Sequence, residues 1–363
     1  MQPNIIDLHC DTVSALAAGI DITRQNPSGH CDIPRLRKGG VGIQIFACFV
    51  SSIVPPADAF PSAQRLISEV KNACARADGE LQLIETTSQI RAMGNQDKIG
   101  VILAVENGHT INNQLENLDE LRKSGVRYLT ITHSKHLPWA ASSGEKWHGG
   151  QALSSFGEQV IDRMNQLGMI VDVSHVHENT FWAIIKKSKR PVIASHSNCR
   201  SICPTERNLS DDQVKAIAGS GGMVGINFYP GFLSEEFLHY QNKNCFDLYL
   251  QLDEIERKNL TDPAARYQAG LVFNQQLQER MKAIDVSMER IVDHIAYITN
   301  LVGDEYVGFG SDFDGIPMLP SDMNGCEDYP EIILRLLKRG FSQQAINNIC
   351  YENFLRVLAS HDN

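Results

Sequence analysis

The stretch MIVDVSH at residues 169–175 shows the pattern that decides the fold, a short apolar run that ends in a polar side chain. Most runs of this kind in the chain are continuously apolar rather than alternating, which is typical of strands buried on both faces of a parallel sheet. Seven further runs share this character, at residues 5–8, 42–50, 100–105, 127–132, 191–194, 223–228 and 306–310.

Helical patterns separate these runs. Residues 156–167 follow Ser154 and Ser155, which are N-cap candidates, and stop at Gly168, a residue suited to a helix C-terminus. Strand and helix alternate, which predicts an α/β fold of the (β/α)8 TIM-barrel type, with one catalytic domain over residues 1–363. An open doubly wound sheet is the alternative, but it normally has a glycine-rich phosphate loop, and the sequence contains neither GxGxxG nor GxxxxGK[ST]. Other helical patterns lie at residues 63–77, 211–218 and 332–338.

The segment between the seventh and eighth predicted strands is longer than one crossover helix requires. Residues 286–301 are expected to form that helix, and residues 248–259 form a second, charged helical pattern. The remaining insertion, about residues 230–285, is expected to be either a lid over the site or an oligomer contact. The sequence leaves both roles open.

Composition excludes several classes of partner. The chain has 363 residues, 42% hydrophobic and 21% charged, with a net charge of −10, so neither nucleic acid nor an anionic membrane is expected as a partner. No apolar run is long enough to cross a bilayer and no signal peptide is visible, which predicts a cytoplasmic protein if Met1 is the natural start. Nine cysteines without a CxxC motif predict free thiols in a reducing compartment.

Polar residues follow the strands at one end. Catalytic groups of (β/α)8 barrels lie at the carboxyl ends of the strands. His9 and Asp11 are two residues apart in the first strand, so both side chains point the same way, toward a metal site. A single histidine at such a position is more often structural, but the whole set favours a metal-dependent enzyme. The other members are Glu106, His133, His175, His196 and Asp312, each after a different strand.

Five of these residues suffice for two metal ions: His9, Asp11, Glu106, His175 and His196. If Glu106 is shared, each ion has three protein ligands and one position left for water. That is the pattern of a catalytic zinc site rather than a closed structural one. Two adjacent ions would lower the pKa of a water molecule between them toward neutrality.

With these motifs, the chain resembles the renal or membrane dipeptidases, zinc enzymes on a (β/α)8 barrel. The resemblance runs nearly from end to end, and the GSDFDG motif together with the spaced histidines is specific. The matching motifs are DLHCDT (7–12), VENGH (105–109), YLTITHS (128–134), PWA (138–140), VDVSHV (171–176), SHSNCRS (195–201), ERN (206–208), INFY (226–229), GFGSDFDG (308–315) and ENFLRVL (352–358). The inserted segment is longer than in the family.

The resemblance implies a role for each site residue. His9 and Asp11 match ligands of one Zn²⁺, His175 and His196 match ligands of a second, and Glu106 matches the bridging carboxylate. Asp312 matches the acid/base group, and His133 matches the residue that polarises the substrate carbonyl. Arg207 matches the cation that holds the substrate carboxylate, and Tyr229 matches a residue lining the site.

The activity that the resemblance implies is hydrolysis of dipeptides with a free C-terminal carboxylate, including L,D-dipeptides, by a homodimer with two Zn²⁺ per chain. One alternative is another amidohydrolase type, such as a lactonase, phosphotriesterase or deaminase. These usually open with HxH and often carry a bridging lysine, whereas this chain has His9 and Asp11 in HxD and Glu106 at the bridge position. A metal-bound protein without catalytic activity is the other alternative.

Overall fold

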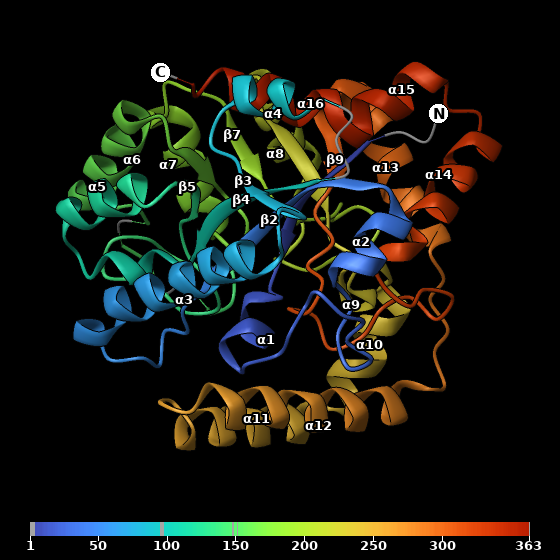
Figure 1. Cartoon of the computed structure of the whole chain (residues 1–363), viewed down its shortest axis with the longest axis horizontal. Coiled ribbons are helices and arrows are strands. Elements are labelled where there is room, and N and C mark those ends of the chain that lie inside the picture. The colour runs from blue at the N-terminus through green and yellow to red at the C-terminus, as the bar shows by residue number, and fades with distance from the viewer. Residues whose placement is uncertain (1–3, 95–97, 147–148, 151, 363) are drawn as a thin grey trace.

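A closed parallel barrel forms the centre of the computed structural model, which describes residues 4–94, 98–146, 149–150 and 152–362. Eight of its strands pair in a ring in the order β1–β2–β4–β5–β6–β7–β8–β9, and β9 returns to β1 (Figure 1). The (β/α)8 prediction is therefore confirmed. The ring strands are β1 (Ile5–Cys10), β2 (Val41–Phe49), β4 (Ile99–Glu106), β5 (Val126–Thr130), β6 (Ile170–Asp172), β7 (Val192–Ala194), β8 (Met223–Ile226) and β9 (Val307–Phe309).

One strand was not predicted. β3 (Leu81–Leu83) pairs in parallel with the first half of β4, beside the ring, because β5 joins β4 only from Leu103 onward. Three residues with a polar Gln82 in the middle are too few to give a periodic signal in the sequence. All eight predicted ring strands are present, and several end a residue or two before the predicted boundary.

Helices surround the ring, and their ends follow the capping residues in the sequence. Ser154 accepts a hydrogen bond from the Gly157 amide at the start of α6, and Gly168 ends this helix in the left-handed conformation at φ 66°. The helices between or after the strands are α1 (Val13–Ala17), α2 (Ile33–Gly39), α3 (Pro56–Arg76), α4 (Thr87–Met93), α5 (Leu115–Lys123), α6 (Ser155–Leu167), α7 (Glu178–Lys187), α8 (Asp211–Gly219), α13 (Glu289–Val302), α14 (Tyr329–Lys338), α15 (Gln343–Asn347) and α16 (Asn353–Ala359).

The barrel is plugged at the amino ends of its strands. Apolar side chains such as Ile6, Ile102 and Ile193 fill the interior, and Phe354 and Leu358 of α16 belong to the same cluster. A second, larger cluster lies between the strands and the outer helices. With one end of the cylinder closed by packed side chains, polar groups gather at the other end, where the strands finish.

The inserted segment is helical: α9 (Pro230–Leu233), α10 (Glu235–Asn244), α11 (Phe246–Lys258) and α12 (Pro263–Met281). α11 and α12 pack against each other as a hairpin beside the barrel, at the bottom of Figure 1. α12 packs against α1, which directly follows β1, and the Asn26 side-chain amide donates to the Tyr267 hydroxyl over 3.3 Å. The hairpin therefore lies on the carboxyl-end side of the strands. The predicted helices at 248–259 and 286–301 correspond to α11 and α13.

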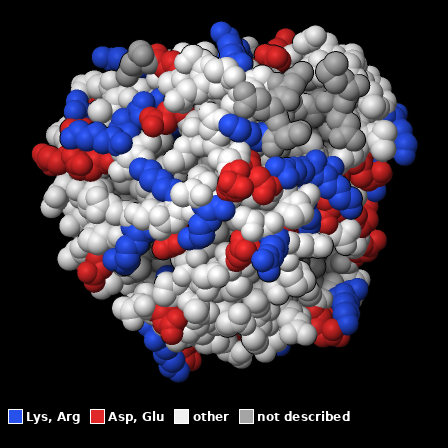
Figure 2. All heavy atoms as spheres, in the orientation of Figure 1, with Lys and Arg blue, Asp and Glu red and all other residues white. Residues whose placement is uncertain are grey.

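Two surface properties bear on possible partners. Among the described residues, no helix combines the length and the apolar character needed to cross a membrane. On the face that Figure 2 shows, basic and acidic side chains are interspersed rather than segregated.

Candidate metal and active site

The predicted polar residues meet at the carboxyl end of the barrel, and Glu106 lies at their centre. Its Oε2 is 3.7 Å from Nε2 of His9, on β1. Its Oε1 is 3.2 Å from Nε2 of His175 and 3.4 Å from Nε2 of His196, which follow β6 and β7. The two carboxylate oxygens therefore face two different sets of donors, as a carboxylate that bridges two cations would.

Two further carboxylates approach His9. Oδ2 of Asp11 is 3.4 Å and Oδ1 of Asp312 is 3.9 Å from its Nε2. Among the residues that the structure describes, three groups of possible ligand atoms have mutual separations within 4.8 Å. They are His9, Asp11 and Glu106; His9, His196 and Asp312; and Glu106, His133 and His175. His133, which was predicted to contact substrate, thus also lies within reach of a cation.

One side of the cluster is buried and the other side is partly accessible to solvent. His9 and His196 are fully buried, Glu106 is 3% exposed, and Asp11 and Asp312 are 8% and 9% exposed. His133, His175 and Arg207 are only partly buried. A small substrate would reach the cluster from their side.

The protein fixes the proton positions of His9. Its Nδ1 lies 2.7 Å from the Tyr128 hydroxyl, which itself donates to the Leu8 carbonyl over 2.9 Å. The hydroxyl oxygen must therefore accept the Nδ1 proton, which leaves the Nε2 lone pair pointing into the cluster. That Nε2 is buried and has no hydrogen-bond partner. Leaving a buried polar atom unpaired is costly, so this nitrogen fits a metal ion.

A similar relay orients His196. Its Nδ1 is 2.7 Å from Oγ of Ser195, and this hydroxyl donates to Oδ2 of Asp172 over 2.6 Å. Asp172 also accepts from the Ser195 amide and the Thr130 hydroxyl, and all of these hydrogen bonds run toward its oxygens. The Ser195 oxygen then accepts the Nδ1 proton of His196, and the Nε2 lone pair faces Glu106. Carboxylates that orient histidine ligands in this way are a usual feature of metal sites.

Two site residues have strained backbones. His175 has φ 67° and Asp312 has φ 63°, a region that residues other than glycine rarely adopt. The His175 carbonyl accepts from the Ser143 amide over 2.8 Å, and the Asp312 amide donates to the His9 carbonyl over 3.0 Å. These bonds hold the two side chains toward the cluster despite the strain. A Cβ on Gly315 would collide with Oδ2 of Asp11 and Oδ1 of Asp312, so glycine at this position leaves room for the two carboxylates.

The electrostatic environment favours neutral imidazoles at His175 and His196 and a positive charge at His9. Burial lowers the pKa of His175 and His196 well below the usual value, and the Arg207 guanidinium contributes in the same direction. Burial also disfavours a charge on His9, but the oxygens of Tyr128 and Glu106 outweigh it and raise the pKa of His9 well above its usual value. The carboxylates thus stabilise a cation at this nitrogen, whether a proton or a metal.

The pKa values of Asp312 and Glu106 shift in opposite directions. Burial raises the pKa of Asp312 well above the usual value, and the neighbouring carboxylates of Asp11 and Glu106 add to this effect. Burial also opposes the ionisation of Glu106, but a positive charge at His9 and a hydrogen bond from His175 hold the pKa of Glu106 well below its usual range. Paired carboxyl groups with pKa values driven apart are suited to different roles, one as proton carrier and one as permanent anion.

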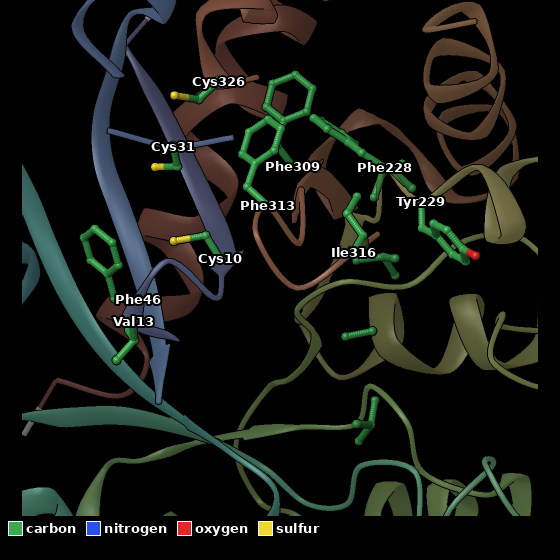
Figure 3. Packing of buried hydrophobic residues seen from close by; sticks show 14 of the residues in the cluster. Cys10, Val13, Cys31, Phe46, Phe228, Tyr229, Phe309, Phe313, Ile316 and Cys326 are labelled. Atoms are coloured by element: carbon green, nitrogen blue, oxygen red, sulfur yellow. The ribbon is translucent and has the colours of Figure 1, made fainter. Parts of the chain in front are cut away.

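The predicted substrate residues lie at the edge of the cluster. Nη1 of Arg207 donates to Oγ of Ser197 and Nη2 donates to the His196 carbonyl, each over 2.7 Å. The Tyr229 hydroxyl donates to Gln241 of α10, and Figure 3 shows it turned away from Phe313. The Tyr229 hydroxyl is therefore engaged with the inserted helices.

Asn227 is a site residue that sequence reasoning did not single out. Its side-chain amide donates to Oδ2 of Asp312 over 2.8 Å, which leaves Oδ1 of Asp312 to face His9. Its own backbone amide donates to Asn198. The only sequence signal was its place within the INFY motif (226–229), next to Tyr229.

Similarity to known proteins covers the whole chain. The sequence model of the membrane dipeptidases, peptidase family M19, matches residues 1–363. The chain belongs to the membrane dipeptidase family. The resemblance inferred from the motifs is thereby confirmed. Members of the membrane dipeptidase family are metal-dependent hydrolases, which agrees with the donor cluster around Glu106.

Individual relatives are distant. An uncharacterized dipeptidase of Schizosaccharomyces pombe is 29% identical over 343 residues, which cover 91% of this chain and 72% of that protein. Dipeptidase 3 of Mus musculus is 28% identical over 333 residues, which cover 91% of this chain but only 57% of the mouse protein. This chain thus spans little more than half the length of the mouse relative.

Solved structures share the barrel. A metallopeptidase from Rhodobacter sphaeroides, solved with a phosphinate mimic of the dipeptide L-Ala-D-Ala, superposes with a TM-score of 0.80 at 22% identity over 99% of both chains. A probable dipeptidase from Pseudomonas aeruginosa gives 0.82 at 20% identity, covering 99% of this chain and 96% of the other. At these identities the likeness establishes a common fold.

The hydroxyl of Tyr128 offers a test of the cluster as a metal site. Tyr128→Phe removes the acceptor for Nδ1 of His9 and keeps the ring, so metal affinity should fall about 10- to 100-fold. Competition with a chromogenic chelator measures this affinity directly. The control is Tyr297→Phe, which removes a hydroxyl bonded to Asp211 on α8. An unchanged dissociation constant in the Tyr128 variant would refute the proposed orientation of His9.

Proposed function

We propose that this chain is a binuclear zinc dipeptidase that hydrolyses dipeptides with a free C-terminal carboxylate, including L,D-dipeptides. The proposal rests mainly on the different surroundings of the two carboxylate oxygens of Glu106. Oε2 faces His9, while Oε1 faces His175 and His196. One ion would be held by His9, Asp11 and Glu106, and the other by Glu106, His175 and His196. Imidazole and carboxylate donors of this number suit zinc.

A pair of zinc ions, when bound, would supply Lewis acidity and lower the pKa of water held between them. The protein's own part begins with Asp312. Its Oδ1 faces the cluster and its Oδ2 is held by Asn227, so one oxygen is free to take a proton from the attacking water. The raised pKa of Asp312 suits it to carry that proton to the leaving amine.

His133 and Arg207 would position the substrate. The His133 ring is partly buried, lies 4.4 Å from the His175 ring and packs on Phe49, so its orientation is fixed. Burial lowers the pKa of His133, and a neutral imidazole there can donate a hydrogen bond to the substrate carbonyl or to the developing oxyanion. Arg207, anchored beside His196, would pair with the terminal carboxylate.

Tolerance of a D-residue at the C-terminal position is part of the proposal. The Rhodobacter sphaeroides metallopeptidase of the same fold binds a phosphinate mimic of L-Ala-D-Ala. A site that binds the substrate carboxylate through Arg207 and leaves the side chain of the C-terminal residue at the open edge would accept either an L- or a D-residue there. L-Ala-D-Ala is therefore a suitable first substrate.

The role of Arg207 can be tested with paired substrates. Arg207→Gln should raise KM for a dipeptide about 10- to 100-fold, because a charge-assisted hydrogen-bond pair is lost. The parent enzyme should prefer the dipeptide to its C-terminal amide, and the variant should lose this preference. Arg339→Gln, at an exposed surface arginine, is the control. Equal use of the acid and the amide by the parent enzyme would contradict the carboxylate clamp.

The same assay should include lactones and phosphotriesters. The HxD pair of His9 and Asp11 and the carboxylate bridge at Glu106 support peptide hydrolysis by a membrane dipeptidase over these reactions. Turnover of a lactone or phosphotriester with no dipeptide cleavage would overturn the proposal. Full zinc loading with no turnover of any substrate would favour a metal-binding protein without catalytic activity.

We also propose a reducing compartment, the cytoplasm, and a homodimeric assembly. All nine cysteines are free thiols in the structure, and all but Cys74 are buried, which suits a reducing location. Exposed apolar residues on the α11–α12 hairpin, Phe246, Leu250 and Val272, offer a surface that a second copy would cover. A solution mass of one chain by light scattering would contradict the dimer.

A further inference from the structure

The inserted helices contact Arg207 directly. α9 opens the insertion just after β8, and the Arg207 guanidinium carbon lies 5.4 Å from the centre of the Phe232 ring. Two N–H groups of this guanidinium donate to Oγ of Ser197 and to the His196 carbonyl. Arg207 is therefore held between the loop that carries a candidate metal ligand and the first turn of the insertion.

Side chains of the loop that carries Arg207 also donate hydrogen bonds to backbone carbonyls of α9. The Asn208 side-chain amide donates to the Phe232 carbonyl and to the Cys203 carbonyl, each over 2.9 Å. The Cys203 thiol donates to the Gly231 carbonyl over 3.5 Å. Since Asn208 is 1% exposed and Cys203 is fully buried, water does not compete for these bonds. The position of Arg207 thus depends on where α9 lies.

A closed ring of hydrogen bonds fixes the next layer. The Tyr229 hydroxyl donates to Oε1 of Gln241 over 2.6 Å, and Nε2 of Gln241 donates to the Tyr249 hydroxyl over 2.8 Å. The two hydroxyls are 3.1 Å apart, so Tyr249 completes the ring by donating to Tyr229. Each group donates once and accepts once. Removal of the Tyr249 hydroxyl leaves two buried groups, the Tyr229 hydroxyl and the Gln241 amide, each without one partner.

Aromatic contacts connect this ring to Arg207 and to the outer hairpin. The Tyr229 ring meets the Phe232 ring edge-on at 5.0 Å, and the Tyr249 ring meets Phe273 of α12 at 5.1 Å. A continuous series of packed side chains therefore runs from α12 through Tyr249, Tyr229 and Phe232 to Arg207. Tyr229 is only 5% exposed, so its ring has little freedom to move independently.

From these contacts we infer that the insertion builds the carboxylate-binding end of the substrate site. Phe232 is a positioning residue for Arg207, and Tyr249 is a positioning residue for Tyr229 and, through it, for Phe232. The ligand class is the terminal carboxylate of a short peptide. This inference rests on the proposed dipeptidase function, and it assigns the insertion a part in substrate binding rather than in the chemical step.

Kinetics of two variants test the inference. Phe232→Leu should raise KM for L-Ala-D-Ala about 5- to 30-fold, the range expected for a partly desolvated cation–π contact. Tyr249→Phe, which keeps the ring, should raise KM about 5-fold. In both, kcat should stay within about twofold of the parent, since the groups around Glu106 are untouched. Zinc per chain should be unchanged.

Controls separate positioning from general damage. Phe232→Tyr keeps the aromatic face under Arg207 and should restore the parent KM. Tyr240→Phe, on α10 of the same insertion, should have no effect. The dipeptide amide lacks the carboxylate, so its KM should not move in either test variant. If Phe232→Leu does not fold, the isosteric Tyr249→Phe decides alone.

Three outcomes would overturn the inference: a parental KM in both variants, an equal KM rise for acid and amide, or a fall in kcat without a change in KM. A parent enzyme that binds zinc and cleaves no dipeptide is a different result. It would remove the proposed function on which the inference rests.

Discussion

Asp312→Asn should lower kcat for dipeptide hydrolysis about 100- to 10,000-fold while zinc binding persists. Asparagine keeps the shape and can still bond to Asn227, but it cannot take a proton from water or pass one to the leaving amine. Asp312 is 9% exposed and its Oδ1 lies 3.9 Å from Nε2 of His9. The nearer carboxylates, Asp11 and Glu106, are proposed metal ligands, so they are not expected to replace Asp312 as proton carrier. Steady-state kinetics with L-Ala-D-Ala measures the loss.

Metal analysis of the same variant separates two roles for Asp312. A carboxylate oxygen of Asp312 lies close enough to ring nitrogens of His9 and His196 for the three groups to share one metal ion. Asp312 therefore has the geometry of a ligand as well as of a proton carrier. Unchanged zinc content with lost turnover identifies a proton carrier, whereas loss of an ion identifies a ligand. Parental turnover would exclude both roles. Asp58→Asn, at an exposed residue of α3, is the matched control.

Glu106→Gln should have the largest effect on metal binding. Glu106 is the residue whose two oxygens face separate donor sets, and glutamine would present an N–H donor to one of them. Both sites should lose affinity, so zinc after dialysis should fall from two ions per chain to less than one, and dipeptide hydrolysis should become undetectable. Inductively coupled plasma mass spectrometry gives the stoichiometry.

Thermal unfolding offers an independent readout of the Glu106 variant. Ligand that binds only the folded state stabilises it, so zinc should raise the Tm of the metal-free parent and leave that of Glu106→Gln nearly unchanged. Glu120→Gln, which removes one surface ion pair with Lys123, should behave as the parent does. Two zinc ions per chain in Glu106→Gln would show that this carboxylate does not bridge.

Much of the fold could be predicted because the barrel strands leave a strong signal. A strand such as β4 is buried on both faces throughout its length, so its residues read as one apolar run. The site residues were predictable for a related reason: His9, Glu106 and His196 lie at or just after strand ends, and parallel strands of a barrel end at the same rim. β3 was not predicted because its three residues are too few to show a periodic pattern of apolar side chains.

The contacts that tune the site could not be predicted because they join residues far apart in the chain. Tyr128 is 119 residues from His9, whose tautomer it sets. The Tyr229 hydroxyl also points to Gln241 and Tyr249 of the insertion, which no local pattern signals. Such pairings follow from the closure of the barrel and from the way in which the insertion folds back on it.

Five side chains from the carboxyl ends of four strands, β1, β4, β6 and β7, are proposed to hold two zinc ions for dipeptide cleavage. Titration of the metal-free protein with zinc, in which bound zinc and L-Ala-D-Ala hydrolysis are both measured, tests this assignment. Activity should be absent without metal, rise with added zinc and reach its plateau at two bound ions per chain. Hydrolysis by the metal-free protein, or a plateau at two ions without any hydrolysis, would contradict it.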